Sequence, residues 1–329
     1  MTADLASVTV LVPGKLHQHA VSRVRETFRL ICLESIDPAL VTGELKETVR
    51  AIAASPAIDK AFIGPDFMRA LPNLEIVANF GVGYDGVDAA YAGRNGIMVT
   101  NTPDVLTEEV ADTAVGLLIS TLREFSRAEA WLRAGDWAGK GNYRLSPLTL
   151  RGRSVGIFGL GRIGLAVARR LEAFGLPIAY HNRRPVEGVA YAYHPTLKGL
   201  AEAVDTLVCV APGGASTEKA IDAGVLAALG SEGVLINIGR GTTVDDDALA
   251  AALKSGAIAA AGLDVFADEP NVPQVLLDAP NTVLLPHIGS ASVHTRRAMA
   301  DLCVDNLVSW FSEGRALTPV PETAAVRAK

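Results

Sequence analysis

Short apolar runs rich in β-branched residues alternate along the chain with longer segments in which apolar residues recur every three or four positions. The first pattern is typical of buried strands and the second of amphipathic helices. In the first hundred residues the strand-like runs are 8–12, 29–33, 60–63, 75–78 and 97–100, and a helix is expected over 17–29. This alternation predicts a parallel sheet built from βαβ units.

A second series of strands follows a long helical stretch. One helix is predicted over 107–134, and the Gly- and Trp-containing segment 135–152 is predicted to be a loop. The later strand-like runs are 154–158, 177–181, 206–210, 234–238, 259–265 and 282–285. Six strands separated by helices predict a doubly wound sheet. A helix is expected over 295–313, with a mobile tail over 316–329. The fold class predicted is α/β, with two Rossmann-like parallel-sheet domains.

The composition narrows the class of protein. Of 329 residues, 49% are hydrophobic and 20% are charged, as in soluble globular proteins. A net charge of −6 argues against bulk binding of nucleic acid or an anionic membrane. There is no apolar run of about 18 residues and no signal-peptide pattern. The cysteines, Cys32, Cys209 and Cys303, are too scattered for a metal or disulfide framework. These features predict a cytoplasmic protein with no membrane, nucleic-acid or metal partner.

A GxGxxG motif lies between a predicted strand and a predicted helix. Its residues are Gly159, Leu160, Gly161, Arg162, Ile163 and Gly164. The first glycine permits a tight turn, the second lets a pyrophosphate approach the backbone, and the third lets helix and strand pack closely. The motif therefore predicts a dinucleotide site at a helix N-terminus. The alternative is a glycine-rich turn that binds nothing.

The end of the next strand bears on the choice of cofactor. An NAD site usually has Asp or Glu there, whereas this chain has Asn182, Arg183 and Arg184. Paired guanidinium groups can bind the ribose 2′-phosphate of NADP. The sequence therefore predicts that NADP(H) is preferred and that NAD(H) is possible. The alternative for the two arginines is a solvated surface turn.

Three later strands end near residues suited to reducing a ketone. Arg240 follows the run 234–238 and could hold a carboxylate and polarise a carbonyl. His287 could protonate the alkoxide that hydride transfer creates, and Glu269 could stabilise the protonated ring. Each residue alone is more often structural or exposed than catalytic. Their co-occurrence behind a dinucleotide motif favours a catalytic set.

With these motifs in order, the chain resembles the D-isomer-specific 2-hydroxyacid dehydrogenase family. The resemblance covers nearly the whole chain and rests on residues 159–164, 236–241, 263–270 and 286–290. It implies that Arg240 clamps the substrate carboxylate and carbonyl, that His287 is the general acid/base, and that Glu269 is its partner. It further implies that Asp264 contacts the nicotinamide side of the cofactor. Glycine at 239 replaces the family's usual alanine, and we expect it to loosen the local backbone.

The resemblance also concerns the first domain and the assembly. The stretch 79–85 looks like the loop whose backbone amides, at Val82 and Gly83, meet the substrate carboxylate. This stretch and residues 182–184 make the chain resemble the NADPH-preferring glyoxylate/hydroxypyruvate reductase branch of the family. Trp137 is similar to a tryptophan that crosses a dimer interface, which implies a homodimer. The family's order implies a substrate domain of 1–101 and 290–329, with a dinucleotide-binding domain of 102–289 inserted in it.

The expected function is reduction of small 2-keto acids, glyoxylate or hydroxypyruvate, to D-2-hydroxy acids by NADPH. One alternative is a dinucleotide-sensing, corepressor-like protein that binds partners with little turnover. Another is a reductase for bulkier 2-keto acids. Formate oxidation is disfavoured because formate dehydrogenases of this fold have Gln where this chain has Glu269.

Overall fold

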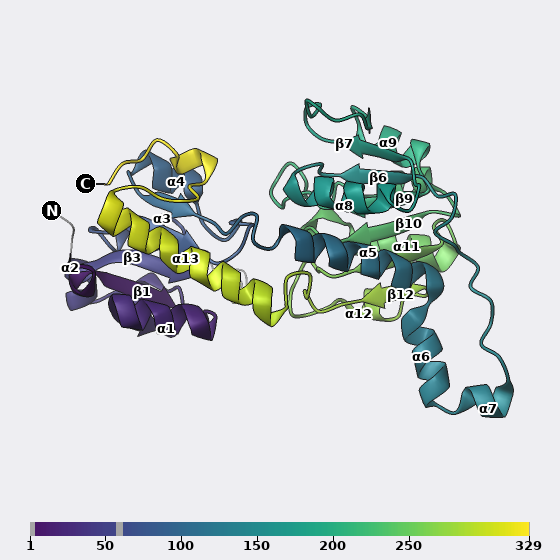
Figure 1. The fold of residues 1–329 in the computed structure, drawn as a ribbon, viewed down its shortest axis with the longest axis horizontal. Helices are drawn as coiled ribbons and strands as arrows, with labels where there is room; N and C mark the ends of the chain where they lie inside the picture. The colour runs from purple at the N-terminus through teal and green to yellow at the C-terminus, as the bar shows by residue number, and fades with distance from the viewer. Residues whose placement is uncertain (1–3, 57–61, 329) are drawn as a thin grey trace. The chain divides into compact units, whose positions relative to one another are not determined.

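The computed structural model describes residues 4–56 and 62–328 (Figure 1). The chain divides into two compact units, Met1–Leu106 with Ser292–Lys329 and Thr107–Ala291. The first unit is thus discontinuous and the second is inserted in it. The chain passes from one unit to the other at 106/107 and at 291/292. The sequence predicted these two boundaries at 101/102 and at 289/290.

The first unit is built on a five-stranded parallel sheet of order β2-β1-β3-β4-β5. Its strands are β1 Thr9–Pro13, β2 Arg29–Leu33, β3 Val49–Ala54, β4 Ile76–Asn79 and β5 Met98–Thr100. Its helices are α1 Gln18–Thr27, α2 Glu44–Thr48, α3 Pro65–Arg69, α4 Ala89–Arg94 and α13 Val293–Glu313. β3 was not predicted, because its Val-Arg-Ala-Ile-Ala-Ala sequence has no strand-like period. The strand predicted at 60–63 lies partly outside the described residues, and Ile63 makes only an isolated bridge to Val87.

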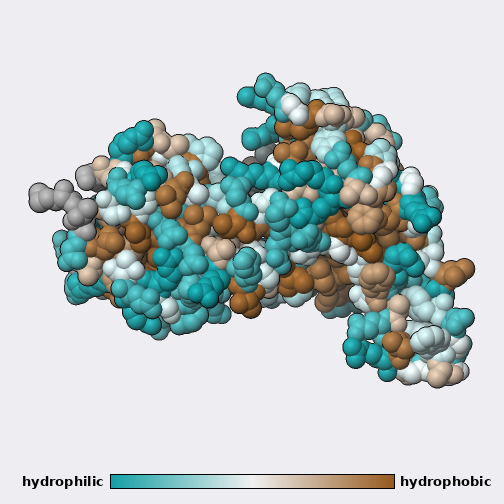
Figure 2. All heavy atoms as spheres, viewed as in Figure 1, coloured by the Kyte–Doolittle hydropathy of each residue, from teal (hydrophilic) through white to brown (hydrophobic). Residues whose placement is uncertain are grey.

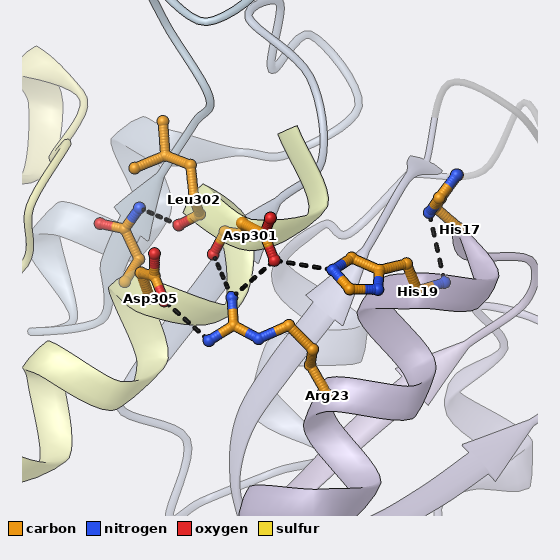
Figure 3. A network of polar contacts seen from close by, with 7 residues as sticks. His17, His19, Arg23, Asp301, Leu302 and Asp305 are labelled. Atoms are coloured by element: carbon orange, nitrogen blue, oxygen red, sulfur yellow. Dashed lines mark hydrogen bonds and ion pairs between the residues drawn. The ribbon is translucent and has the colours of Figure 1, made fainter. Parts of the chain in front are cut away.

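Helix α13 returns the chain to the first unit, where ion pairs join it to α1 (Figure 3). Arg23 binds Asp301 at 3.0 Å and Asp305 at 2.9 Å. His19 Nε2 lies 2.7 Å from the same Asp301 carboxylate. These half-exposed pairs contribute little free energy each, but together they fix the register of the two helices.

The tail after α13 is ordered, so the prediction of a mobile segment over 316–329 is wrong for the part that the structure describes. Pro319 bridges Thr100 of β5, and a 3-10 turn covers Pro321–Thr323. Val320 is 1% exposed and Thr323 is fully buried. Val320 packs in the hydrophobic core of the unit, and the Thr323 hydroxyl donates to the Val99 carbonyl of β5, so contacts with distant residues hold the segment in place.

The second unit is built on a seven-stranded parallel sheet of order β12-β11-β10-β9-β6-β7-β8. Its strands are β6 Val155–Phe158, β7 Ile178–His181, β8 Ala192–Tyr193, β9 Thr206–Cys209, β10 Val234–Asn237, β11 Ala260–Leu263 and β12 Thr282–Leu284. Six of these strands were predicted from the sequence, and β8, which has only two residues, was not. The chain order reverses between β6 and β9, where doubly wound sheets bind ligands. The predicted α/β fold with two parallel-sheet domains is confirmed.

The helix predicted over 107–134 is broken. The helices of this unit are α5 Thr107–Arg123, α6 Phe125–Arg133, α7 Asp136–Lys140, α8 Arg162–Glu172, α9 Leu197–Ala203, α10 Ala223–Leu229, α11 Asp246–Ser255 and α12 Gln274–Leu277. Between α5 and α6, Glu124 adopts a left-handed conformation with φ of 55°. Its carboxylate accepts hydrogen bonds from Tyr143, at 3.0 Å, and from Arg144. The predicted loop 135–152 contains α7 and returns past this break.

Residues 4–56 and 62–328 contain neither a candidate membrane span nor a candidate metal cluster. No helix there combines the length and apolarity that a bilayer crossing needs. Likewise, no group of three or more His, Cys, Asp or Glu side chains there is arranged to hold a metal ion.

Candidate active site

The GxGxxG segment forms the turn between β6 and α8, and its backbone could cradle a pyrophosphate. Gly159 has a φ of 101°, and a Cβ there would lie 2.7 Å from the Ala211 nitrogen. A Cβ on Gly164 would lie 2.4 Å from the Gly159 carbonyl oxygen, so neither position tolerates a side chain. Gly161 is the N-cap of α8 and leaves it without a side-chain cap, with open space around it. An uncapped helix N-terminus beside open space fits a bound phosphate group.

Asn182 at the end of β7 holds this turn in shape. Its Oδ1 accepts a hydrogen bond from the Leu160 N–H at 2.7 Å, and its Nδ2 donates to the Leu160 carbonyl at 3.3 Å. Arg183 and Arg184 follow and are exposed. Among the residues that the structure describes, neither guanidinium takes part in an ion pair. Two uncompensated positive charges therefore lie just after the second strand of the nucleotide fold.

The predicted catalytic residues follow three neighbouring strands. Arg240 comes after β10, Asp264 after β11 and His287 after β12, and parallel strands bring these ends to one edge of the sheet. A Cβ on Gly241 would lie 1.8 Å from the Phe266 carbonyl carbon. Only glycine therefore lets the backbone after Arg240 pack against the loop that leads to Glu269.

Gly239 also serves close packing. It is buried, and a Cβ there would lie 2.7 Å from the Ala211 carbonyl oxygen. In this structure glycine lets the end of β10 pack against the segment after β9. The expected loosening of the backbone at this position stays a prediction.

His287 and Glu269 form the predicted pair. The His287 Nδ1 lies 2.7 Å from Glu269 Oε2, and Glu269 Oε1 accepts the Phe266 N–H at 2.9 Å. Burial acts to raise the pKa of Glu269, but the His287 hydrogen bond and charge, the Phe266 amide and the Arg240 charge together lower it below its usual value. Glu269 is thus ionised at neutral pH. Because Glu269 engages Nδ1, the Nε2 atom of this 42% exposed side chain is the one suited to meet a substrate.

Asp264 shapes the turn that presents His287. Its two carboxylate oxygens accept the N–H groups of Ile288 and Gly289 at 2.7 and 2.8 Å, and its carbonyl accepts the His287 N–H at 2.8 Å. Asp264 is 1% exposed, and this burial raises the pKa of its carboxyl group despite the amide bonds. These bonds hold His287 in a left-handed conformation with φ of 54°. The sequence did not reveal this structural task, and a contact with the cofactor stays a prediction.

The loop after β4, in the first unit, has its carbonyl groups tied back. Asn79 Nδ2 donates to the carbonyls of Gly81 and Gly83, at 3.1 and 3.0 Å, and Asn101 Nδ2 donates to that of Val82 at 2.8 Å. Within the described part of the chain, no acceptor is found for the N–H groups of Val82 and Gly83. Such N–H groups could bind a carboxylate.

Two side chains that the sequence analysis did not single out stand beside this loop. The His17 ring stacks on Phe80 with centroids 5.8 Å apart. The Arg296 guanidinium lies 5.9 Å from the centre of the same ring. Burial, followed by the charges of His19 and Arg296, lowers the pKa of His17. Arg296 therefore adds positive charge beside the loop, and no sequence motif had pointed to it.

Comparisons with known proteins agree with this geometry. The family model described as D-isomer specific 2-hydroxyacid dehydrogenase, NAD binding domain, matches residues 115–289. A solved structure of an NADPH-dependent glyoxylate/hydroxypyruvate reductase from Sinorhizobium meliloti, in complex with NADP and malonate, is 60% identical. The match covers 98% of this chain and 99% of that one, with a TM-score of 0.94.

Two curated plant proteins are also similar. The glyoxylate/hydroxypyruvate reductase A of Arabidopsis thaliana is 43% identical over 96% of this chain and 100% of its own. The hydroxyphenylpyruvate reductase of Plectranthus scutellarioides is 46% identical over 83% of this chain and 86% of its own.

The GxGxxG turn and the His287–Glu269 pair are the features expected of an NAD(P)-dependent oxidoreductase. The chain belongs to the D-isomer specific 2-hydroxyacid dehydrogenase family. The predictions of family, enzyme class and dinucleotide binding are therefore confirmed. The individual site residues remain assigned by geometry, with Arg240, Glu269 and His287 in the second unit and Val82 and Gly83 in the first.

Proposed function

We propose that the protein reduces glyoxylate and hydroxypyruvate to the corresponding 2-hydroxy acids, of D configuration where the product is chiral, with NADPH. The observation that carries the proposal is the 2.7 Å pair of His287 and ionised Glu269, with Arg240 near enough to lower the pKa of that glutamate. The names of the similar reductases support the same substrates.

Each residue has a defined task in this proposal. A bound NADPH supplies hydride to the keto carbon. The Arg240 guanidinium holds the substrate carboxylate by two parallel hydrogen bonds and polarises the keto oxygen, which gains negative charge. His287 gives its Nε2 proton to that oxygen, and Glu269 stabilises the ring before the proton leaves. In the first unit, the amides of Val82 and Gly83 bind the carboxylate.

A panel assay tests the proposed function. Purified protein is mixed with NADPH and, in turn, glyoxylate, hydroxypyruvate, pyruvate, phenylpyruvate and oxaloacetate, and NADPH absorbance is followed. We expect the first two acids to give the highest kcat/KM. Cofactor binding without oxidation by any acid would sink the proposal and favour the corepressor-like alternative. Highest kcat/KM with phenylpyruvate would favour a reductase for bulkier acids, as one relative's name suggests.

Removing both arginines after β7 should change the cofactor preference. In Arg183→Ala/Arg184→Ala we expect the KM for NADPH to rise by about tenfold or more, since a hydrogen bond to a charged group contributes about 1.5–3 kcal/mol. The KM for NADH should change by less than about threefold, because NADH has no 2′-phosphate for the arginines to bind. Initial rates with each cofactor measure this. Arg151→Ala, which removes another exposed arginine of the same unit, is the control. Equal losses with both cofactors would refute the role given to this pair.

We also propose that the protein is a homodimer joined through α6 and α7, which project from the second unit (Figure 1). This projection and the segment that follows it expose large apolar side chains: Phe125 at 53%, Leu132 at 54%, Trp137 at 60% and Leu145 at 92%. Figure 2 shows this part of the surface as a mixture of hydrophobic and hydrophilic residues. Such a cluster is typical of a surface that a partner covers.

The proposed location is the cytoplasm, which fits three cysteines that are all free thiols.

Charge placed on this projection should break the dimer. We expect the unchanged protein to sediment as a dimer and Leu132→Glu to sediment as a monomer, because the partner would have to bury an unpaired carboxylate. Analytical ultracentrifugation measures both species. Phe174→Glu, at an apolar residue of the second unit exposed to a similar degree, 51%, is the control and should leave the dimer intact. A monomeric unchanged protein, or equal effects of the two variants, would contradict the assignment of this interface.

A further inference from the structure

We propose that residues 317–323, after the last helix, position the loop 79–85 for substrate binding. Their contacts reach the loop through Asn101 and through Tyr84. The inference rests on the proposed function in one respect: it takes this loop as the element that binds the carboxylate of the 2-keto acid. It assigns Thr318, Glu322 and Tyr84 as positioning residues.

The first connection runs from Thr318 to the Val82 carbonyl. The Thr318 hydroxyl donates to the Asn101 carbonyl at 2.6 Å, and the Asn101 N–H donates to the Thr318 carbonyl at 3.3 Å. The Asn101 side chain then donates to the Val82 carbonyl at 2.8 Å. The Val82 carbonyl and the Gly83 N–H belong to the same planar peptide group. The bond that fixes the carbonyl therefore also sets the direction of the Gly83 N–H.

Thr318 is itself held by a fully buried residue of α13. Asn306 is 0% exposed, and its Oδ1 accepts the N–H groups of Leu317 and Thr318 at 3.0 Å each. Its Nδ2 donates to the Thr318 hydroxyl and to the Leu302 carbonyl, at 2.8 Å each. All the hydrogen-bonding capacity of this amide is used, so the position of Thr318 follows that of the helix.

The second connection joins Glu322 to the far end of the loop. The Tyr84 hydroxyl donates to Glu322 Oε2 at 3.1 Å. Burial, followed by the charge of Glu322, raises the pKa of Tyr84 to about 12, so this hydroxyl remains a donor at neutral pH. A Cβ on Gly93 would lie 2.3 Å from the Glu322 carbonyl oxygen, so α4 packs closely against the segment. Next to it, Thr323 exchanges hydrogen bonds with the Val99 main chain at 3.0 and 3.1 Å.

The two connections hold the loop at Val82 and at Tyr84, on either side of Gly83. A glycine-rich loop has many accessible conformations, and only some of them point its amides at one anion. Fixing both sides lowers the entropy cost of binding the carboxylate. The inference therefore predicts an effect on the KM for the acid and little effect on kcat or on cofactor binding.

Tyr84→Phe and Thr318→Val test the two connections, singly and together. We expect each single change to raise the KM for glyoxylate by about three- to tenfold, the range of one net hydrogen bond. We expect the double variant to show about the product of the two effects. The kcat and the NADPH dissociation constant, measured by fluorescence titration, should stay within about twofold. Thr318→Ser keeps the hydroxyl and should restore the KM.

Binding of oxamate, an unreactive analogue of a 2-keto acid, gives a readout that does not depend on turnover. Isothermal titration of the NADPH complex should show its dissociation constant rising in parallel with the KM. Tyr91→Phe is the matched control, because Tyr91 lies on α4 of the same unit and its ring contacts the Arg69 guanidinium. It should leave both quantities unchanged.

Three results would overturn the inference. They are a Tyr84→Phe variant that behaves like Tyr91→Phe, losses shared equally by kcat and NADPH binding, and a Thr318→Ser variant no better than Thr318→Val. The proposed function fails separately, if the unchanged protein reduces no 2-keto acid. In that case the oxamate titrations still decide whether the segment positions an anion-binding loop. An unchanged protein that neither reduces a 2-keto acid nor binds oxamate would overturn both.

Discussion

Arg240→Ala is expected to lower kcat/KM for glyoxylate by about a thousandfold or more. Loss of one donor to a developing oxyanion costs about 10²–10³ in rate, and the lost carboxylate contact adds to this. The affinity for NADPH should stay within about twofold, because the residues that we propose as cofactor ligands, the glycine turn and the arginines after β7, lie in other parts of the unit. Steady-state rates and a fluorescence titration with NADPH measure the two quantities.

Arg240→Lys separates charge from geometry. Lysine keeps the positive charge near Glu269 but lacks the planar fork that matches a carboxylate, so we expect it to recover only part of the activity. Arg151→Ala again controls for the loss of an arginine elsewhere in the unit. If Arg240→Ala weakened NADPH binding as much as it lowered kcat/KM, Arg240 would be a cofactor ligand and its assignment as the substrate clamp would be wrong.

The sequence predicted those parts of the fold whose pattern is local. Strands buried on both faces of a sheet appear as unbroken apolar runs, which is why the strand that precedes Arg240 was found within one residue of its bounds. β3 was missed because alanine-rich Val49–Ala54 resembles a helix. The break at Glu124 depends on Tyr143 and Arg144, which come 19 and 20 residues later. No local pattern indicates a contact of that kind.

In the candidate site, too, features with a local sequence pattern were predicted and contacts between distant residues were not. Arg240 and His287 could be predicted because parallel strands bring their carboxyl ends to one edge. The residues that hold the loop 79–85 could not be predicted, since the bond from Thr318 to Asn101 spans 217 positions. Asp264 was predicted only to contact the cofactor. Its bonds to Ile288 and Gly289 were not predicted, because they depend on a turn 24 residues away. Sequence spacing thus identified residues with reactive side chains better than the residues that orient them.

His287→Gln is expected to lower kcat/KM by about 10²–10⁴, the usual contribution of a general acid. Glutamine can still accept or donate a hydrogen bond, but it cannot give up a proton at neutral pH. Because the proposed step consumes a proton, we expect the reduction rate of the unchanged protein to fall as pH rises, and the variant should lose this dependence. Rates of glyoxylate reduction from pH 5 to 9 at saturating NADPH measure both effects.

Glu269→Gln tests the partner of His287 in the same experiment. Because the pKa of Glu269 lies below its usual value, its carboxylate is charged throughout this pH range and favours the protonated ring. With a neutral amide, the alkaline fall of the reduction rate should begin at a lower pH, and the loss of activity should therefore grow as pH rises. In His287→Gln the loss should be present even at the acid end of the range. A loss in Glu269→Gln that is the same at every pH would show that Glu269 only orients the ring and does not stabilise its charge.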